Sequence, residues 1–327
     1  MFSSIYVHDL DPVLIRITET IAVRWYGLAY IAGFVAAYWL LRYLSRKNLY
    51  PVPREKLADY ITLMAIFGVL IGGRLGYVLF YQIPREGISL FMQDWTSAFR
   101  VWEGGMASHG GILGVILFIC FYAWRHHMSA LALMDGVAVV APVGLFFGRI
   151  ANFINGELYG RLAPPGSSVA MKFPAEAFEP SYPKETLVHA VERSLGTNLP
   201  GDTFHQKIGE IIRLTRENET VREIVGAHLP PRYPSQLFEA AAEGLLLFAV
   251  LWWVRMRFPK APKGLFCSLF CFLYAAGRIV TECFREPDAP LWMGVTRGQY
   301  LSFFLVIGGC LFLIPVWRER RRRSFRD

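Results

Sequence analysis

Charged side chains are scarce in this chain of 327 residues. Asp, Glu, Lys and Arg make up only 18% of it, whereas soluble domains usually carry about 25%. Hydrophobic residues account for 54%, and the mean hydropathy is +0.33. These values exclude an ordinary water-soluble enzyme and a largely disordered chain. Runs of about 20 apolar residues recur along the sequence, which is typical of a polytopic membrane protein.

Cysteine is also rare. The chain has five cysteines, all within or at the edge of apolar segments: Cys120, Cys267, Cys271, Cys283 and Cys310. Small apolar side chains facing lipid are the simplest interpretation, and disulfides, a metal site and a catalytic thiol are the alternatives. Residues 1–20 are mixed polar, so we expect no cleavable signal peptide.

The net charge of +8 does not predict a nucleic-acid partner. Lys and Arg lie in short clusters beside apolar runs instead of along one polar face. One cluster directly follows the last apolar run and consists of Arg318, Arg320, Arg321, Arg322, Arg323 and Arg326. Such a tail is typical of a stop-transfer flank against anionic lipid, so the expected partner is the lipid bilayer.

Seven segments are long and apolar enough to span a membrane: 22–41, 58–81, 106–124, 130–154, 234–254, 264–283 and 298–317. Basic clusters follow the first, third, fifth and seventh segments, and the opposite short loops are poor in Lys and Arg. The positive-inside rule then puts the N-terminus outside and the C-terminus in the cytoplasm. The predicted fold is an all-α integral membrane protein with seven transmembrane helices in one polytopic domain, residues 1–327.

The long loop 157–233 lies on the outer side in this topology. It is rich in Pro and Gly at first, and then Phe204, Ile208, Ile211 and Ile212 follow the i, i+4, i+7, i+8 spacing of a helix face. We expect a small extracytoplasmic cap with one or two short helices, inserted between the fourth and fifth spans. The chain shows no internal repeat, which weighs against a repeat-built transporter.

Ionisable side chains inside or beside the predicted spans are the most informative residues. They are Arg24, Arg74, His109, Asp135, Arg149, Glu239, Glu243, Arg278 and Glu282, with Glu103 and Glu157 just outside. An Arg at the centre of a membrane helix costs about 2.5–3.5 kcal/mol on insertion scales. Arg74, Arg149 and Arg278 must therefore meet a partner, a water-filled cavity or an anionic ligand.

Structural explanations compete for several of these groups. Arg278 has a carboxylate four residues later, with which it can pair along one helix face. Glu239 and Glu243 are one turn apart, and we expect at least one of them to pair with an Arg. Arg24 can extend its side chain to the membrane interface. Asp135 lies near a helix N-terminus, where a carboxylate is favoured.

Three arginines nevertheless point to a ligand. Arg74, Arg149 and Arg278 all fall toward the outer ends of spans two, four and six. Together they supply more positive charge than structural pairing requires. The arginine side chain presents a rigid fork of donors that suits phosphate. The pattern predicts a site for a phosphate-bearing lipid headgroup, reached from the outer leaflet.

Glycine is concentrated around two of these residues. Gly72, Gly73 and Gly76 flank Arg74, and a second group flanks His109: Gly104, Gly105, Gly110, Gly111 and Gly114. Such density lets helix backbones approach closely, and broken helix ends there can offer N–H groups to an anion. His109 is either a catalytic group or a hydrogen-bonded structural one.

The most specific motif is GRIANFINGELYGR at residues 148–161. Arg149, Asn152 and Asn155 recur every three residues and follow one helix face as it leaves the membrane. The run resembles the signature of the prolipoprotein diacylglyceryl transferases, the bacterial enzymes that lipidate the lipobox cysteine. The resemblance extends over all seven spans, with further motifs at 24–28, 72–77, 104–111, 233–239 and 274–285. Ala151 and Tyr233 depart from the usual Gly and His, and loop 166–228 matches nothing in the family pattern.

This resemblance implies a reaction and its partners. The family transfers a diacylglyceryl group from phosphatidylglycerol to the thiol of a lipobox cysteine in a prolipoprotein signal peptide. The products are a thioether-linked preprolipoprotein and glycerol 1-phosphate, in the first step of lipoprotein maturation. The implied location is the bacterial cytoplasmic (inner) membrane, as a multi-pass protein. The sequence shows no metal cluster and no nucleotide-binding loop, so it implies no cofactor.

Candidate roles follow for the residues that match the family's motifs. Arg149 and Arg278 are the candidates for phosphate binding and leaving-group stabilisation, and His109 is the candidate general base for the thiol. The candidate substrate-binding residues are Tyr26, Arg74, Asn152, Asn155, Glu157, Gly160, Tyr274 and Glu282. Of these, Glu282 is expected to orient Arg278, and Gly160 to shape the turn where the chain leaves the membrane.

Two other classes of protein are compatible with a cationic site in a membrane. A transporter or flippase would bind an anionic substrate with the same arginines and release it unchanged. A structural assembly subunit would need neither substrate nor turnover, but it leaves the concentration of Arg and Asn toward one membrane face unexplained.

Overall fold

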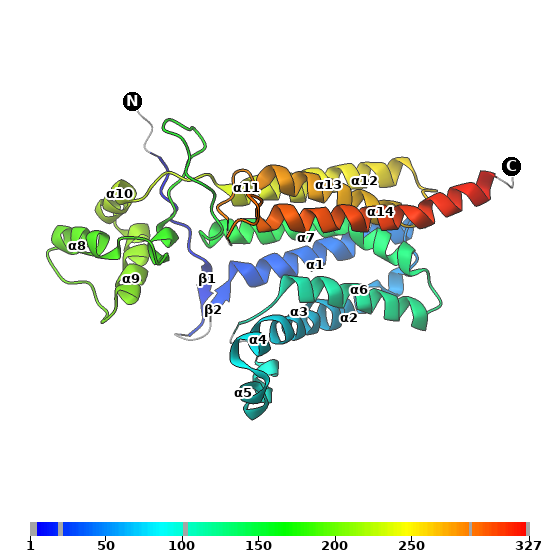
Figure 1. The fold of residues 1–327 in the computed structure, drawn as a ribbon, viewed down its shortest axis with the longest axis horizontal. Coiled ribbons are helices and arrows are strands. Elements are labelled where there is room, and N and C mark those ends of the chain that lie inside the picture. Colours follow the sequence, from blue (N-terminus) through cyan, green and yellow to red (C-terminus); the bar gives the residue numbers. More distant parts are fainter. Residues whose placement is uncertain (1–4, 19–21, 101–103, 288–289, 325–327) are drawn as a thin grey trace. The chain divides into compact units, whose positions relative to one another are not determined.

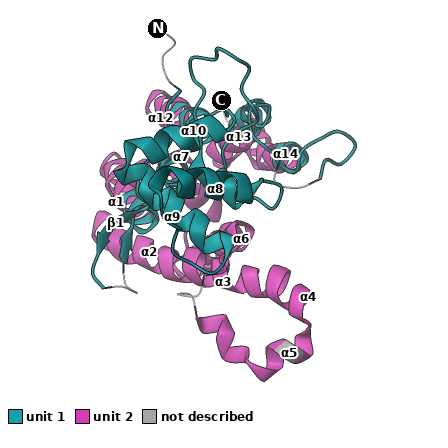
Figure 2. Cartoon of the chain, turned by 90° about the vertical axis from the view of Figure 1, so that its left-hand side faces the viewer, with its two compact units in different colours: residues 1–33, 143–247, 273–306 teal, residues 34–142, 248–272, 307–327 magenta. Residues whose placement is uncertain are grey.

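The computed structural model describes residues 5–18, 22–100, 104–287 and 290–324 (Figure 1). Glu103 and Arg326, which the sequence singled out, lie outside these ranges. Of Arg320, Arg322 and Arg323 the structure describes the backbone and not the side chains. The chain divides into two compact units (Figure 2). Unit 1 comprises residues 1–33, 143–247 and 273–306, and unit 2 comprises residues 34–142, 248–272 and 307–327.

Helices dominate the described residues, with one short strand pair near the N-terminus. In chain order the elements are β1 (Val13–Arg16), β2 (Ala22–Arg24), α1 (Trp25–Arg46), η1 (Arg54–Lys56), α2 (Leu57–Leu63), η2 (Met64–Ile71), α3 (Gly72–Tyr77), η3 (Val78–Gln82), α4 (Ile83–Glu86), α5 (Ile88–Gln93), η4 (Trp95–Phe99), α6 (Ser108–Arg125), α7 (Ala130–Ile154), η6 (Pro174–Phe178), α8 (Lys184–Leu195), α9 (Phe204–Glu217), α10 (Glu219–His228), α11 (Ser235–Glu239), η7 (Ala240–Leu246), α12 (Leu247–Arg257), α13 (Leu265–Thr281) and α14 (Arg297–Ser324). The segments η2, η3 and η7 are π-helical.

Six helices of the described chain are long and apolar enough to cross a membrane. They are Trp25–Arg46, Arg54–Glu86, Ser108–Arg125, Ala130–Ile154, Ser235–Arg257 and Arg297–Glu319. A seventh apolar helix, Leu265–Thr281, is shorter. The prediction of a mostly helical, multi-pass membrane protein is confirmed. Apolar side chains cover the outside of these helices because lipid, and not water, is the solvent there.

The start of the first span differs from the prediction. Arg24 is the last residue of β2, which pairs antiparallel with β1, and the helix begins only at Trp25. The hydropathy of residues 22–24 resembles that of the helix, but their backbone hydrogen bonds go to a neighbouring strand. Arg24 is exposed and lies outside the helix, where its charge is free to meet water.

In unit 2, glycines bring two helices into close contact. A Cβ added to Gly72 would lie 2.9 Å from the Cα of Gly114, and one added to Gly76 would lie 2.5 Å from the Cα of Gly110. Larger residues would push α6 away from the Arg54–Glu86 helix. The expectation that these glycines let helix backbones approach is therefore confirmed.

Asp135 has a structural position in unit 2. Its carboxylate is buried and accepts hydrogen bonds from the backbone N–H groups of Gly264 (2.7 Å) and Cys267 (2.9 Å). These donors belong to the first turn of α13 and the residue before it, where N–H groups have no partner within the helix. The structural interpretation of Asp135 is supported, although the helix it caps is α13 and not its own.

Residues 157–233 contain more helices than the sequence suggested. The stripe at Phe204 to Ile212 lies on α9 as expected, with Ile208 and Ile211 fully buried. The expectation of one or two helices was wrong, because α8 and α10 pack beside α9. Their buried residues are Leu187, Val188 and Val191 in α8 and Val221 and Val225 in α10. Each helix is short and mostly polar, so its apolar stripe is too brief to stand out in the sequence.

Candidate functional site

A cluster of six charged side chains lies in unit 1, on α7, the Ser235–Arg257 helix, α13 and the segment after α13. Its centre is Glu239, which is fully buried. Glu239 Oε2 lies 2.9 Å from Nη1 of Arg149, and its Oε1 lies 2.8 Å from Nη1 of Arg278 and 3.0 Å from Nη1 of Arg285. One carboxylate therefore holds three guanidinium groups together.

Two further carboxylates complete the cluster. Glu243 lies 3.3 Å from Arg149 Nη2 and 3.4 Å from Arg278 Nη1, and it accepts a hydrogen bond of 2.9 Å from the Thr281 hydroxyl. Glu282 lies 2.9 Å from Arg278 Nη2, one helical turn along the chain. The pairing of Arg278 with Glu282, and of Glu239 and Glu243 with arginine, is confirmed.

The charges in this cluster balance. It holds three arginines and three glutamates, so the expected surplus of positive charge is not present there. The sequence predicted that at least one of Glu239 and Glu243 pairs with an arginine, whereas each contacts at least two. Buried charges are retained only when paired and hydrogen-bonded, and this mutual pairing explains how six ionisable groups are tolerated among apolar helices.

The cluster is preorganised but not sealed. The side chains of Arg149 and Arg278 are 17% and 12% exposed, whereas those of Glu239 and Glu243 are completely buried. The contacts of Arg149 to the two glutamates engage two of the five N–H groups of a guanidinium. Tyr274 lies close enough to Arg149 and Arg278 to interact with both. Fixed guanidinium groups with accessible donors are suited to binding a phosphate group as charge develops on it.

A second polar group lies at the end of α7 in the same unit. The hydroxyl of Tyr26 donates to Oε1 of Glu157 at 2.5 Å, and Nδ2 of Asn152 donates to the same oxygen at 2.7 Å and also to the Tyr26 hydroxyl. The Nε2 group of Gln236 donates to the backbone carbonyl of Glu157 at 2.6 Å. Oδ1 of Asn155 is buried and has no hydrogen-bond partner among the residues that the structure describes. Three of the candidates named from the sequence, Tyr26, Asn152 and Glu157, therefore form one hydrogen-bonded group. Gln236 was not selected from the sequence.

Gly160 lies where three segments of the chain meet. Its N–H donates to the carbonyl of Tyr233 at 2.8 Å, and the neighbouring Arg161 N–H donates to the carbonyl of Phe284 at 2.8 Å. A Cβ on Gly160 would lie 2.4 Å from the Phe284 oxygen and 2.7 Å from the Tyr233 oxygen. Only glycine leaves room for these backbones, so Gly160 joins the ends of α7 and α13 to the start of α11.

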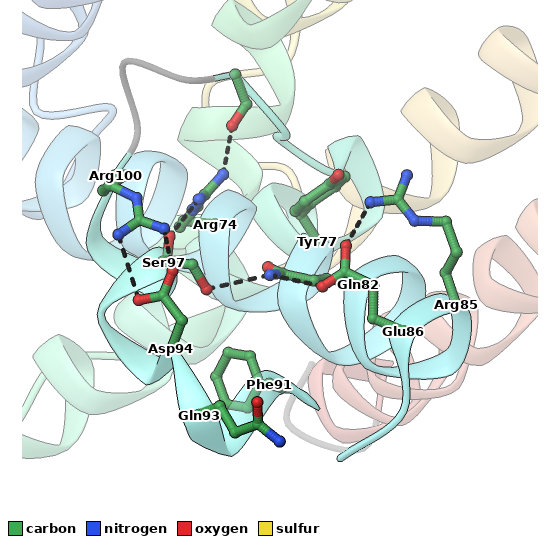
Figure 3. A pocket seen from close by; sticks show the side chains of 11 residues that line it. Arg74, Tyr77, Gln82, Arg85, Glu86, Phe91, Gln93, Asp94, Ser97 and Arg100 are labelled. Atoms are coloured by element: carbon green, nitrogen blue, oxygen red, sulfur yellow. Dashed lines mark hydrogen bonds and ion pairs between the residues drawn. The ribbon is translucent and has the colours of Figure 1, made fainter. Parts of the chain in front are cut away.

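Arg74 lies in unit 2 and has a different environment. It is 6% exposed, and its guanidinium donates to the carbonyls of Ser97 (2.5 Å), Ala98 (3.1 Å) and Gly105 (2.9 Å), and also to that of Gly104. Figure 3 shows Arg74 beside Ser97. Four donors are thus directed at the loop between α5 and α6. Through these four carbonyls Arg74 can hold this part of the chain against α3.

A pocket of about 430 Å³ adjoins Arg74 (Figure 3). Two ion pairs line it, Arg85 with Glu86 at 2.6 Å and Arg100 with Asp94 at 2.5 Å. His109 also belongs to unit 2, as the second residue of α6, and its side chain is exposed. Within the described ranges, no group of three or more His, Cys, Asp and Glu side chains is arranged to hold a metal ion.

Two residues of unit 1 were not selected from the sequence. Arg285 is 5% exposed and contacts Glu239. Arg278, Glu282 and Arg285 follow the i, i+4, i+7 spacing of one helix face. This spacing is the feature of the sequence that could have identified Arg285. His8 is buried between Phe173 and Phe153, whose ring centroids lie 5.6 and 5.3 Å away. Burial lowers the pKa of His8 below its usual 6.5. A single His near the N-terminus carries no sequence signal of this burial.

Known proteins resemble this chain over nearly its whole length. The family model for prolipoprotein diacylglyceryl transferase matches residues 12–315. A protein of Bdellovibrio bacteriovorus named phosphatidylglycerol–prolipoprotein diacylglyceryl transferase is 39% identical, over 95% of this chain and 94% of its own length. Proteins of the same name from Rhodospirillum centenum and Neisseria gonorrhoeae are each 38% identical, over 93% and 92% of this chain and 91% and 94% of their own lengths. The chain therefore belongs to the prolipoprotein diacylglyceryl transferase family.

Proposed function

We propose that this protein transfers the diacylglyceryl group of phosphatidylglycerol to the thiol of the lipobox cysteine in bacterial prolipoproteins. The observation that supports this most directly, beside family membership, is the pair Arg149 and Arg278. Both are held by shared buried carboxylates and both keep part of the guanidinium accessible. A phosphate ester is the part of phosphatidylglycerol that such a pair recognises.

The chemistry requires one bond to form and one to break. The cysteine sulfur attacks the glyceryl carbon that carries the phosphate, forming a C–S bond as the C–O bond to the phosphate breaks. Glycerol 1-phosphate leaves with the electron pair, and Arg149 and Arg278 stabilise its charge. The thiol, with an ordinary pKa of about 8.5, must lose its proton to become the nucleophile. His109 is the proposed acceptor of that proton.

The remaining candidates hold substrate or position the arginines. Glu282 orients Arg278 through their contact of 2.9 Å. Tyr26, Asn152 and Glu157 form one hydrogen-bonded set that can contact the headgroup, and the buried Oδ1 of Asn155 can accept a hydrogen bond from a headgroup hydroxyl.

Three other residues complete the proposed site. Tyr274 lies beside both arginines and can contact the bound lipid. Gly160 keeps the turn after α7 compact. Arg74 acts on substrate chiefly through the loop that it holds.

We also propose the full topology. In it, Leu265–Thr281 also crosses the membrane, as the sixth of seven spans. The N-terminus lies outside and the C-terminus in the cytoplasm of the cell, and the protein resides in the bacterial inner membrane. The basic clusters after spans one, three, five and seven support this orientation. Residues 1–327 then form one polytopic domain, with 157–233 as an extracytoplasmic insertion.

Mass spectrometry of a lipobox peptide tests the proposal. The purified protein is incubated with phosphatidylglycerol and a peptide that contains the cysteine, beside a matched peptide in which serine replaces it. We expect a diacylglyceryl mass increase on the cysteine peptide alone. Lipid movement across liposome membranes without any peptide adduct would instead identify a transporter and contradict the proposal.

A further inference from the structure

A short segment of unit 2, residues 88–99, exposes an unusual set of large apolar side chains. Ile88, Met92, Trp95 and Phe99 are 66%, 64%, 57% and 67% exposed. The segment comprises α5 and η4, and it lies between two long apolar helices, Arg54–Glu86 and Ser108–Arg125. Side chains of this size are rarely left in water as a group.

Polar side chains of the same segment and of Arg100 beside it face the pocket next to Arg74, and Ser97 among them is buried. Asp94, Ser97 and Arg100 line the pocket beside Arg74 (Figure 3). Nε2 of Gln82 donates to the Ser97 hydroxyl at 3.1 Å. The segment therefore has one face fixed to the protein by polar contacts and an opposite face of apolar side chains, which is the pattern of an interfacial membrane segment.

The contacts of Arg74 indicate how deep the segment lies. Arg74 precedes the helix end at Glu86 by twelve residues, or about 18 Å along a helix axis. An arginine side chain is much shorter than that distance. Since Arg74 donates to the carbonyls of Ser97 and Ala98, the chain must turn back along α3 after Glu86. In Figure 1, α5 lies below α4 and does not continue in the direction of α3 and α4.

The depth of Arg74 follows from the charges along its helix. Between Asp59 and Arg85, the one charged side chain is Arg74. A hydrocarbon core about 30 Å thick takes about 20 residues of helix, so a core that fills this interval has Arg74 well inside it, in the half nearer Glu86. Non-helical backbone at such depth is tolerated only where its polar groups are satisfied by the protein. The bonds from Arg74 satisfy four carbonyls after α5 in this way, those of Ser97, Ala98, Gly104 and Gly105.

We propose that residues 88–99 form a re-entrant segment that inserts its apolar face into the leaflet next to Glu86, the outer leaflet in the proposed orientation. The partner of Ile88, Met92, Trp95 and Phe99 is then the acyl chains of the lipid. Leu75, on the adjoining Arg54–Glu86 helix, is likewise exposed, at 51%. The proposal depends on the membrane spans and not on the transferase reaction.

Spin-label accessibility in liposomes of phosphatidylethanolamine and phosphatidylglycerol tests this proposal. Nitroxides are attached to Met92→Cys and Phe99→Cys on the apolar face, and to Gln93→Cys and Thr96→Cys as matched controls from the same segment. All four positions are exposed, so labels there need not disturb packing. The exposed native cysteines are removed first by Cys120→Ala, Cys283→Ala and Cys310→Ala.

Collision rates with oxygen, which concentrates in lipid, and with a water-soluble nickel chelate distinguish the outcomes. We expect labels at 92 and 99 to favour oxygen several-fold and labels at 93 and 96 to favour the nickel chelate. Nickel accessibility at all four positions would overturn the proposal. Exclusion of both reagents at 92 and 99, with dipolar broadening between labels, would show a second copy of the chain on this face and would overturn it as well.

Discussion

Replacement of Glu239 by glutamine tests how the arginine cluster is held. Glu239 is fully buried and contacts Arg149, Arg278 and Arg285 at 2.8–3.0 Å. Glutamine has nearly the same shape and keeps one acceptor oxygen, but it removes the negative charge. Three guanidinium groups would then share two carboxylates, so part of the buried positive charge would lose its compensation.

The expected cost can be bounded from the contacts. Loss of one partner of a buried ion pair typically destabilises a protein by about 3–5 kcal/mol. Arg149 and Arg278 keep Glu243 as a partner, which places the expected loss for Glu239→Gln near the lower end, about 3 kcal/mol. Glu282→Gln is the matched control, because Glu282 contacts Arg278 and none of the other arginines in the cluster. We expect a clearly smaller loss there.

Reversible unfolding in detergent, followed by circular dichroism, measures these differences. A double variant, Glu239→Gln with Arg285→Gln, should be less destabilised than the sum of its single variants, because it removes both members of one pair. A free energy of unfolding for Glu239→Gln within about 0.5 kcal/mol of the parent protein, the range of neutral surface changes, would refute the assigned role of Glu239.

Four further predictions concern the proposed reaction and the fold. Arg149→Ala and Arg278→Ala should each insert into membranes yet lose most transferase activity, and near-normal turnover of either purified variant would contradict a leaving-group role. His109→Gln should be slow at neutral pH and recover partly at higher pH, where the thiol ionises unaided; a flat residual pH–rate profile would mean that His109 is structural. Gly160→Ala should lower the free energy of unfolding by about 1–3 kcal/mol, since its Cβ would meet two backbone carbonyls, and an unchanged melting temperature would refute that reading. Because burial depresses the pKa of His8 below 6.5, the unfolded chain binds a proton more readily than the folded one. Stability should therefore fall as the pH drops below about 6.5, and His8→Gln should lose this part of the pH dependence; the same pH dependence in both proteins would assign it to other groups.

Much of the membrane architecture could be predicted because hydropathy determines it directly. The predicted span 130–154 agrees with α7, Ala130–Ile154, at both ends. The second predicted span, 58–81, is part of a longer helix, Arg54–Glu86. Its charged ends are helical because neighbouring turns supply their backbone hydrogen bonds, and hydropathy does not report that continuation. The helices within residues 157–233 were underestimated for the related reason that their apolar stripes are short.

Contacts within the candidate site could be predicted where both partners are side chains close together in the sequence. Arg278 and Glu282, four residues apart in the sequence, make the contact that their spacing suggested. Arg74 shows the limit of such reasoning. Its partners are backbone carbonyls 23 to 31 residues away in the chain. Since every residue has a backbone carbonyl, the sequence does not indicate which of them Arg74 contacts. The shared use of Glu239 by three arginines likewise depends on how separate helices pack, which no spacing within one helix reveals.

Simultaneous measurement of both products tests the central claim most directly. The purified protein is given phosphatidylglycerol and a lipobox peptide, and the lipidated peptide and the released glycerol phosphate are quantified over the same time course. If the arginine cluster stabilises a phosphate leaving group displaced by the thiol, the two products should accumulate in equal molar amounts. Glycerol phosphate without lipidated peptide, or neither product while the lipid is still bound, would contradict the account.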